Sequence, residues 1–158
     1  MILTVSTPRP MPAGVVWSLV KQTATFQYVA RGVLRFSTGT DLPDEWQEGR
    51  TICSRLVLLG FLPAWVHELQ VTGVDDERQR VRTAEKGGLL RRWDHTLAVE
   101  PDGEERCTYT DTAVLEAGVL TPTVWLVAWG FFRYRQWRLR RWVRLHAAVP
   151  PTGKADHA

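Results

Sequence analysis

Five strand-like segments separated by short turns constrain the fold of this chain more than any other feature of its sequence. The segments cover residues 50–59, 64–74, 79–85, 89–100 and 106–117. Their connections contain the Gly, Pro and Asp residues that are typical of tight turns, as in Gly87-Gly88 and Pro101-Asp102-Gly103. Because such turns join neighbouring strands that run in opposite directions, the pattern predicts an antiparallel meander.

A long helix is expected after the meander. Gly118 interrupts the last strand, and Thr121-Pro122 is a typical helix start, with Thr as the N-cap and Pro at the first helical position. The apolar and basic residues that follow can form one helix to about Ala147, which would be roughly 40 Å long at 1.5 Å per residue.

Smaller elements are expected before the meander. Ile2–Ser6 alternates like a short strand, and residues 12–21 suit a helix with Pro in its first turn. A second short helix is expected over Thr23–Ala30, with Thr23 as its cap, and Val33–Ser37 begins extended structure. The sequence therefore predicts an α+β fold in which an antiparallel sheet is closed by one long C-terminal helix.

The length of the chain limits its domain organisation. A chain of 158 residues is long enough for one domain with a substantial core and too short for two comfortable ones. We expect the domain to cover residues 1–147 and residues 148–158 to form a flexible C-terminal tail, because Pro150-Pro151 stops the helix. The segment Thr38–Gly49, with Pro43 and several acidic residues, is expected to be the most mobile loop.

The net charge of +3 comes from one segment. Six arginines and no acidic residue lie between Arg133 and Arg144, whereas the rest of the chain holds 14 basic and 17 acidic residues. A nucleic-acid partner is therefore not expected. The same segment alternates arginine with apolar residues. This pattern fits either a membrane-surface stripe or an amphipathic helix whose arginines point outward and pair with acids of the meander.

No segment has the properties of a signal peptide or a membrane span. Met1–Val5 is followed by prolines rather than an apolar region, and the longest mostly apolar run, Val124–Phe132, is far shorter than the about 20 residues that a span needs. Cys53 and Cys107 have no metal-ligand spacing, and no phosphate-binding, dinucleotide or metalloprotease motif occurs. We expect a cytoplasmic monomer or homodimer without a cofactor or a metal, in which Cys53 is buried filler.

A mixed apolar and polar face is predicted for the last strands of the meander. If the last two strands pair around the turn at 101–105, His95 lies directly opposite Asp111. Pairing the preceding strand in a similar way adds Glu85 and Arg91 to this face. The other face is more uniformly polar, so the mixed face should look toward the long helix, where its polar groups need partners.

Two interpretations of these polar residues stay open. In one, they are preorganised groups in an apolar pocket, with His95 as a general acid or base, Asp111 orienting it and Arg91 stabilising negative charge. In the other, they are cross-strand pairs that fix the register of the sheet and meet no ligand. The candidate catalytic residues are His95, Asp111 and Arg91. The candidate ligand-binding residues are Trp65, Glu85, Arg91, Trp93, His95, Tyr109, Asp111 and Phe131.

Six segments carry a resemblance to a known superfamily. They are EWQEG at Glu45–Gly49, LGFLP at Leu59–Pro63, GGLLRRWDH at Gly87–His95, TYTD at Thr108–Asp111, EAGVLTPTVW at Glu116–Trp125 and FFRYRQWRLRRW at Phe131–Trp142. Through them the chain, from Ile2 to Leu145, resembles the START-like helix-grip superfamily, also called the SRPBCC or polyketide cyclase and lipid-transport superfamily. The match is strongest to a branch of bacterial proteins of about this length.

The resemblance implies an antiparallel sheet that grips the last helix, with a cavity between them for lipids, sterols, polyketides or other apolar molecules. Some members catalyse cyclisation, aromatisation or hydrolysis in this cavity, but the resemblance provides no catalytic set that can be matched residue by residue. The fold hosts many functions, so the chemistry has to be argued from the site.

Three functions are considered in order. The first is a carrier or binding protein for a small hydrophobic or aromatic molecule, which predicts a pocket of at least ~300 Å³. The second is a cyclase/aromatase- or hydrolase-type enzyme that uses His95 in the same cavity. The third is a membrane-surface or partner-binding adaptor, which predicts that the tryptophans of the basic helix end form an exposed patch.

Overall fold

Seven strands form one antiparallel sheet in the computed structural model, which describes residues 1–37, 42–59 and 61–146. The strands are β1 (Ile2–Arg9), β2 (Leu34–Ser37), β3 (Thr51–Leu58), β4 (Leu62–Asp75), β5 (Arg80–Gly87), β6 (Leu90–Pro101) and β7 (Cys107–Glu116). Their order in the sheet is β1-β7-β6-β5-β4-β3-β2. The predicted meander is confirmed as β3 to β7, and β1 and β2 extend its two edges.

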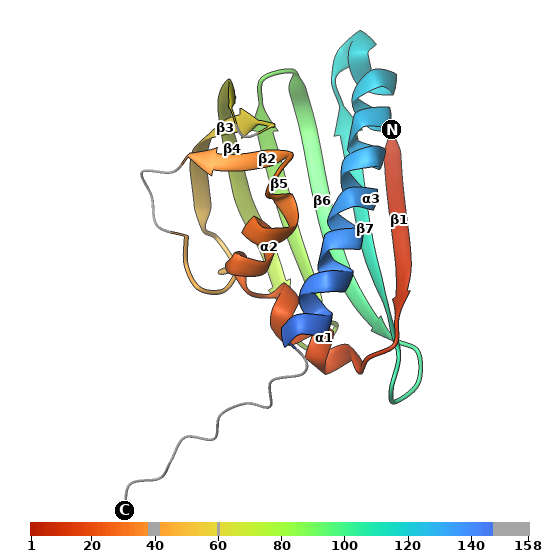
Figure 1. Cartoon of the computed structure of the whole chain (residues 1–158). Coiled ribbons are helices and arrows are strands. Elements are labelled where there is room, and N and C mark those ends of the chain that lie inside the picture. Colours follow the sequence, from red (N-terminus) through yellow and green to blue (C-terminus); the bar gives the residue numbers. More distant parts are fainter. Residues whose placement is uncertain (38–41, 60, 147–158) are drawn as a thin grey trace, which may run out of the picture.

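The helices lie on one face of this sheet. α1 (Ala13–Val20) and α2 (Thr23–Ala30) separate β1 from β2, and α3 (Thr121–His146) follows β7 after a short 3-10 helix, η1 (Gly118–Leu120). Figure 1 shows α3 crossing the sheet from the region of β1 and β7 toward α1, with α2 in front of the other half of the sheet. The predicted α+β class and the helix-grip arrangement are therefore confirmed.

Strict alternation in β7 explains how the sheet obtains a buried face. Cys107, Tyr109, Asp111, Ala113 and Leu115 are buried, whereas the threonines between them are only partly buried. Because successive side chains of a strand point to opposite faces, this pattern turns one face of β7 toward α3.

The buried side chains form two clusters under the helices. The larger cluster joins α1, α2 and the C-terminal half of α3 to the middle of the sheet, and it includes Val16, Leu69 and Leu139. The smaller cluster joins β1 and β7 to the first half of α3 through Leu3, Leu115, Phe132 and their neighbours. Several buried polar residues, described below, lie on the same inner side of the sheet.

The predicted register between β6 and β7 is wrong by two residues. His95 pairs with Ala113, and Asp111 pairs with Leu97. The turn is wider than expected, because Pro101 pairs with Cys107 and the backbone N–H of Asp102 donates to the carbonyl of Arg106 at 2.9 Å. A slip of two residues keeps every side chain on its predicted face, so the mixed face itself is confirmed.

Two helix starts differ in detail from the prediction. Thr23 does not cap α2: Gln22 holds the cap position, and the Thr23 hydroxyl instead donates to the carbonyl oxygen of Pro43 at 2.5 Å. At the start of α3 the Thr121 hydroxyl accepts from the backbone N–H of Ala117 at 2.9 Å. The short helix η1 immediately before Thr121 was not predicted.

The predicted tail at residues 148–158 lies outside the described residues, as do residues 38–41 of the predicted mobile loop. In the described remainder of that loop, Leu42 and Pro43 are half-buried and one residue is buried. Trp46 is buried, and its backbone N–H donates to the carbonyl of Lys21 at 3.1 Å. In the described part of the chain, no helix combines the length and the apolar character that crossing a bilayer requires.

Candidate functional site

A small cavity lies between the sheet and the helices. Its volume is about 30 Å³, enough for one or two water molecules. It is lined by Val20, Thr25, Phe26, Val29, Trp46, Leu69, Val81, Thr83, Glu85, His95, Leu97, Tyr109, Arg135 and Leu139. The expected volume of at least ~300 Å³ is wrong, because large side chains such as Phe26, Trp46 and Arg135 occupy the space.

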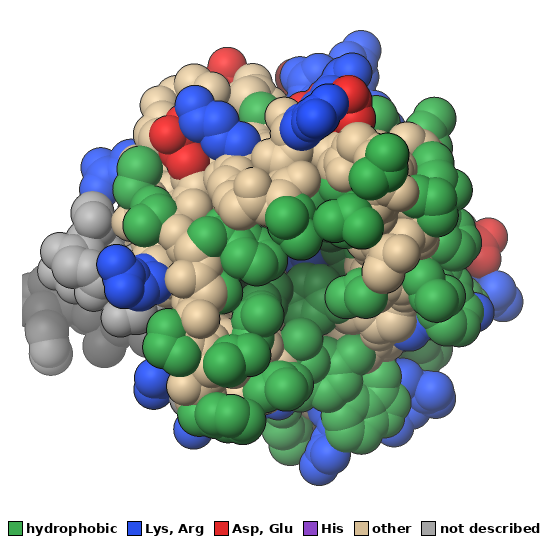
Figure 2. Space-filling view, turned by 90° about the horizontal axis from the view of Figure 1, so that it is seen from above, with side chains coloured by type: hydrophobic (Ala, Val, Ile, Leu, Met, Phe, Trp, Pro, Cys, Tyr) green, Lys and Arg blue, Asp and Glu red, His purple; other side chains and the backbone are tan. Residues whose placement is uncertain are grey.

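A second, smaller cavity of about 10 Å³ adjoins the first. Phe26, Trp46 and Leu69 line both cavities, while His67 and Ser54 line only the second. The two cavities therefore share part of their wall. Figure 2 shows a hollow in the face of the molecule seen from above Figure 1, with hydrophobic side chains around it.

Asp111 is the centre of a buried hydrogen-bond network. Its carboxylate accepts from His95 Nε2 at 2.9 Å, from the Tyr109 hydroxyl at 3.1 Å and from Gln136 Nε2 at 3.2 Å. Because the carboxylate is an acceptor, the Nε2 atom of His95 carries the proton in this bond. Gln136 also donates to the carbonyl of Val5 at 2.7 Å, so the network ties β1, β6, β7 and α3 together.

Glu85 forms a second polar cluster on β5. Its carboxylate accepts from His67 Nε2 and from the Thr83 hydroxyl, both at 2.8 Å. The His67 Nδ1 atom is buried and has no hydrogen-bond partner within the described residues. The cluster therefore keeps one imidazole nitrogen without a hydrogen-bond partner in the described part of the chain, in a residue that lines the second cavity.

Arg135 places a positive charge in the interior. Its side chain reaches from α3 into the first cavity, and the residue is only 5% exposed. The guanidinium lies over the rings of Phe26, Phe131 and Phe132 at 5.5–5.7 Å from their centroids. Its Nη2 atom is 3.8 Å from Asp111 Oδ1, which is close enough for ionic attraction but too far for a hydrogen bond.

The ionisation of these groups follows from burial and neighbouring charge. Burial raises the pKa of Asp111, but the charge of Arg135 and the hydrogen bond from His95 outweigh it, so this pKa lies below its ordinary value. The pKa of Glu85 is also lowered, because the hydrogen bond from His67 and the neighbouring histidines outweigh burial. Burial and the charge of Asp111 hold the pKa of Tyr109 well above its ordinary value, so Tyr109 stays protonated.

The structure brings together only part of the predicted site. Glu85, His95 and Tyr109 line the first cavity, and Asp111 lies directly behind His95 and Tyr109. Arg91 does not pair with Glu85: it is exposed and lies beside Gly118 at the end of the sheet. The prediction that Arg91 belongs with the other polar groups is therefore wrong: regular pairing of β5 with β6 ends at Glu85 and Trp93, and Arg91 lies beyond it.

Of the predicted aromatic residues, Tyr109 lines the first cavity, whereas Trp65, Trp93 and Phe131 lie around it. Trp93 packs edge-on against Phe132 at 5.9 Å, and Phe131 belongs to the same smaller core cluster. Trp65 lies on the inner face of β4, close against Gly88 in the turn between β5 and β6. These three residues border neither of the two cavities described above.

Sequence reasoning missed the importance of Arg135. On α3 five of the six described buried residues, Ala128, Phe132, Arg135, Leu139 and Val143, follow one another at intervals of four and three, and Gln136 is the sixth. This is the spacing of one helix face, so the apolar members of the series predict that position 135 faces inward. His67 could have been placed in the same way, because it shares the inner face of β4 with Leu69 and Val71.

The basic end of α3 was expected to be either a membrane-surface stripe or an amphipathic helix whose arginines pair with acids of the meander. The structure agrees with neither expectation in full. Its exposed arginines lie over aromatic rings, with Arg133 at 5.5 Å from Trp129 and Arg141 at 5.3 Å from Trp137. Among the described residues, the one acid that pairs with an arginine of α3 is the buried Asp111. Trp137 is 54% exposed, as the adaptor hypothesis requires, but Trp142 packs against Tyr28 at 4.3 Å.

The predictions for cysteine and metal can also be compared with the structure. Cys53 is exposed on β3, so its prediction as a buried residue is wrong, whereas Cys107 is buried. Within the described ranges, no group of three or more His, Cys, Asp or Glu side chains is arranged to hold a metal ion. The polar groups that line the first cavity are one carboxylate, one imidazole, one phenol, one guanidinium and two threonine hydroxyls, all of which can hydrogen-bond to a ligand.

Comparison with known families and proteins relates the chain to one family. The family model described as "Domain of unknown function (DUF8410)" matches residues 10–143. A search of curated proteins finds no match.

Several solved structures are similar over nearly the whole chain. Norcoclaurine synthase from Thalictrum flavum, in complex with dopamine and hydroxybenzaldehyde, has a TM-score of 0.69 at 14% identity, covering 92% of this chain and 87% of the enzyme. A START superfamily protein from Mycobacterium smegmatis has a TM-score of 0.65 at 11% identity, with coverages of 91% and 97%. A protein from Thermus thermophilus has a TM-score of 0.65 at 21% identity, with coverages of 94% and 100%. At these identities the similarities show the START-like helix-grip fold.

Proposed function

Because this chain belongs to the family described as a domain of unknown function (DUF8410) and has a helix-grip fold, we propose that it binds a small hydrophobic or aromatic molecule between the sheet and α3. The observation that carries the proposal is the composition of the cavity wall. Apolar side chains such as Val81 and Leu139 surround a few polar groups that converge on one space. Ligand sites commonly combine an apolar wall with a small number of placed polar groups.

The small volume of the cavity requires that side chains move when a ligand enters. Phe26 and Trp46 line both cavities, and their rings contact each other edge-on at 5.3 Å. Rotation of either ring would join the spaces without moving a strand. Side-chain rearrangements of this kind are common when a protein binds a partner.

The similar proteins support a ligand of this chemical class. The norcoclaurine synthase structure holds two aromatic molecules, dopamine and hydroxybenzaldehyde. The fold typically encloses hydrophobic ligands, although it also hosts other functions. For this chain the exposed end of the hollow is itself hydrophobic, which would allow an apolar molecule to enter (Figure 2).

The test compares a variant that fills the cavity with a matched variant on the surface. Val81→Phe adds a ring at a lining position, whereas Val66→Phe adds the same ring on the exposed side of β4. Native mass spectrometry of freshly purified protein would identify a co-purifying apolar molecule, and titration with that molecule would give its affinity. Binding should be lost in Val81→Phe and kept in Val66→Phe. Equal binding by both variants would contradict the proposed location.

A second candidate is an enzyme that transfers protons in the same cavity. One observation favours it: His95 lines the cavity, while its Nε2 atom is fixed by Asp111, so its second ring nitrogen could serve as a base. Turnover of the bound molecule should then be lost in His95→Gln while its binding is kept. Absence of turnover in the unaltered protein would leave the binding function alone.

A further inference from the structure

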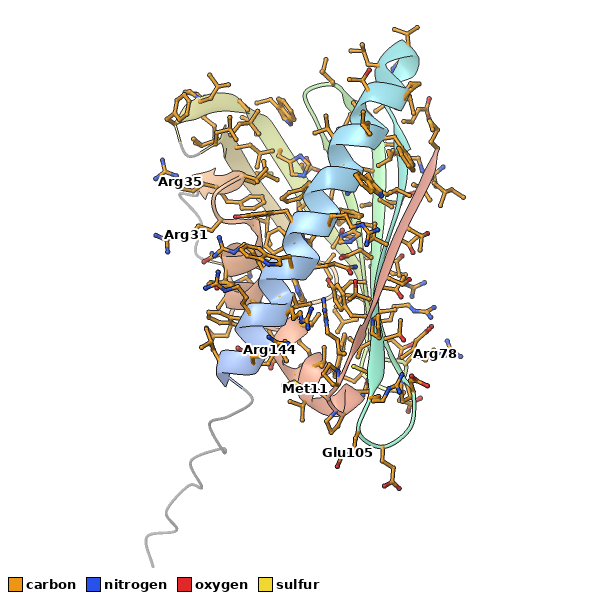
Figure 3. The ribbon with its side chains drawn as sticks, turned by 45° about the vertical axis from the view of Figure 1, so that its right-hand side comes forward. Met11, Arg31, Arg35, Arg78, Glu105 and Arg144 are labelled. Atoms are coloured by element: carbon orange, nitrogen blue, oxygen red, sulfur yellow. The ribbon has the colours of Figure 1, made fainter. Side chains whose placement is uncertain are left out.

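Arg135 is the buried side chain whose hydrogen-bonding capacity is least used. In Figure 3, Arg31, Arg35 and Arg78 point away from the space between the sheet and α3, as arginines usually do. Arg135 instead lines the first cavity and is 5% exposed. It is therefore placed to meet whatever enters the cavity.

The Arg135 guanidinium has no hydrogen-bond acceptor within residues 1–37, 42–59 and 61–146, and its Nε atom is both buried and unpartnered. A guanidinium offers five N–H donors and is always charged. Phenylalanine rings and the Asp111 carboxylate at 3.8 Å compensate the charge but accept none of these donors. Since buried donors are nearly always satisfied, an acceptor is expected to reach Arg135 in the liganded protein.

The charges that face Arg135 limit the kind of acceptor. Asp111 faces it from β7 and Glu85 from β5, and both carboxylates are held in the ionised form. His95 on β6 and His67 on β4 use their Nε2 protons in bonds to these carboxylates, and Tyr109 donates its proton to Asp111. Two carboxylates therefore already face the one guanidinium, and Asp111 Oδ1 lies 3.8 Å from its Nη2 atom, so a third carboxylate would be repelled by both.

We propose that Arg135 is the ligand-anchoring residue and that it binds an uncharged carbonyl oxygen, as in an apolar or aromatic ketone, aldehyde or ester. A carbonyl oxygen accepts from the guanidinium without adding negative charge. The apolar remainder of the ligand would lie against the aliphatic and aromatic wall formed by residues such as Phe26 and Leu97. This inference rests on the proposed binding function and specifies its ligand class.

The test uses three single-ring probes in NMR titrations of the whole chain. Acetophenone carries the carbonyl, ethylbenzene has a similar shape without an acceptor, and benzoate carries a carboxylate. Each is titrated into the unaltered protein, into Arg135→Met, and into Arg138→Met as a control. Arg138 lies on the same helix, but it contacts the Tyr28 ring and the carbonyl of Arg31 and borders neither cavity.

The affinity for acetophenone relative to ethylbenzene should fall about tenfold or more in Arg135→Met, since hydrogen bonds to charged groups contribute this much. The ratio should change less than about twofold in Arg138→Met. Comparing the ratio between variants cancels the different hydration of the two probes. If Arg135→Met does not fold, Arg135→Lys, which keeps the charge with fewer donors, should give an intermediate ratio.

The remaining outcomes separate this inference from the proposed function. An unchanged ratio in the Arg135 variants, with both probes bound, would overturn the assignment to Arg135 and leave the binding function intact. Benzoate binding to the unaltered protein at least as tightly as acetophenone would overturn the preference for an uncharged acceptor. If no probe shifts the resonances of the cavity residues, the proposed function and this inference both fail for ligands of this size.

Discussion

His95 and Asp111 are joined by a hydrogen bond of 2.9 Å although they are not cross-strand partners. The residue opposite Asp111 is Leu97, and the residue opposite His95 is Ala113. The bond therefore runs diagonally past the small Ala113 side chain, which leaves room for the imidazole. Tyr109 and Gln136 complete the surroundings of a carboxylate that has no exposed surface.

Replacement of Asp111 by Asn should destabilise the fold by about 2–4 kcal/mol, because it leaves the buried charge of Arg135 without its nearest counter-charge. Urea unfolding at pH 7 measures this difference. Asp102→Asn is the matched control, since Asp102 pairs with Arg106 in the exposed turn between β6 and β7. The control should change stability by less than about 1 kcal/mol. Equal effects of the two substitutions would contradict a structural role for the buried network.

The stability of the protein should decrease in acid. Asp111 and Glu85 have lowered pKa values in the folded protein. Their contribution is therefore complete above the pKa values of the unfolded chain, about 3.9 for Asp and 4.3 for Glu, and is lost as the pH falls through the lower folded values. Urea unfolding between pH 7 and pH 2.5 should show this loss, and the slope should be smaller in Asp111→Asn. Identical slopes in the two proteins would exclude Asp111 as a source of the stability that is lost in acid.

Gly88→Ala should destabilise the protein far more than Gly103→Ala. Both glycines have positive φ, +57° and +88°, so both substitutions incur the same kind of backbone strain, about 1 kcal/mol. A Cβ atom at Gly88 would lie 2.3 Å from Trp65 Cδ2, whereas one at Gly103 would meet nothing within 4 Å. The added crowding should cost about 1–3 kcal/mol in Gly88→Ala and should change the fluorescence of Trp65. Equal unfolding free energies would mean that Trp65 moves freely at this turn.

The sequence predicted the strands and their faces well for a physical reason. Alternation has a period of two, so an error of two residues in the register left Trp93, His95 and Tyr109 on the buried face. Arg91 was placed on this face by the same alternation, but regular pairing of β5 with β6 ends at Glu85 and Trp93, and an irregular pairing leaves no clear pattern in the sequence. Of the six arginines on α3, only Arg135 lies in the buried series. The spacing of the apolar members of that series is the signal that could have identified it.

The volume of the cavity was the least predictable quantity. It depends on how the side chains of Phe26, Trp46 and Arg135 fill a space that the backbone leaves open. The resemblance to ligand-binding proteins predicted where the cavity lies, because this follows from the arrangement of sheet and helix. It could not predict side-chain packing, which a few bulky residues determine.

Phe26→Ala should join the two cavities and improve the binding of a larger ligand while it lowers stability. The ring lines both spaces, so we expect its removal to connect them, and the loss of a partly buried ring should cost up to about 3 kcal/mol. We expect 2-acetylnaphthalene, which has two fused rings and a carbonyl, to bind more tightly to this variant than to the unaltered protein. Fluorescence titration measures the affinity, and urea unfolding confirms that the variant remains folded.

Phe131→Ala is the matched control for this substitution. Its ring lies 5.7 Å from the Arg135 guanidinium, as the Phe26 ring lies 5.6 Å from it, but it borders neither cavity. Both variants therefore lose one ring from around Arg135, and only Phe26→Ala adds space. A gain in affinity confined to Phe26→Ala would indicate that packing around Phe26 limits the size of the ligand. A similar gain in both variants would instead point to the release of Arg135, and no gain in either would contradict entry of the ligand through displacement of Phe26.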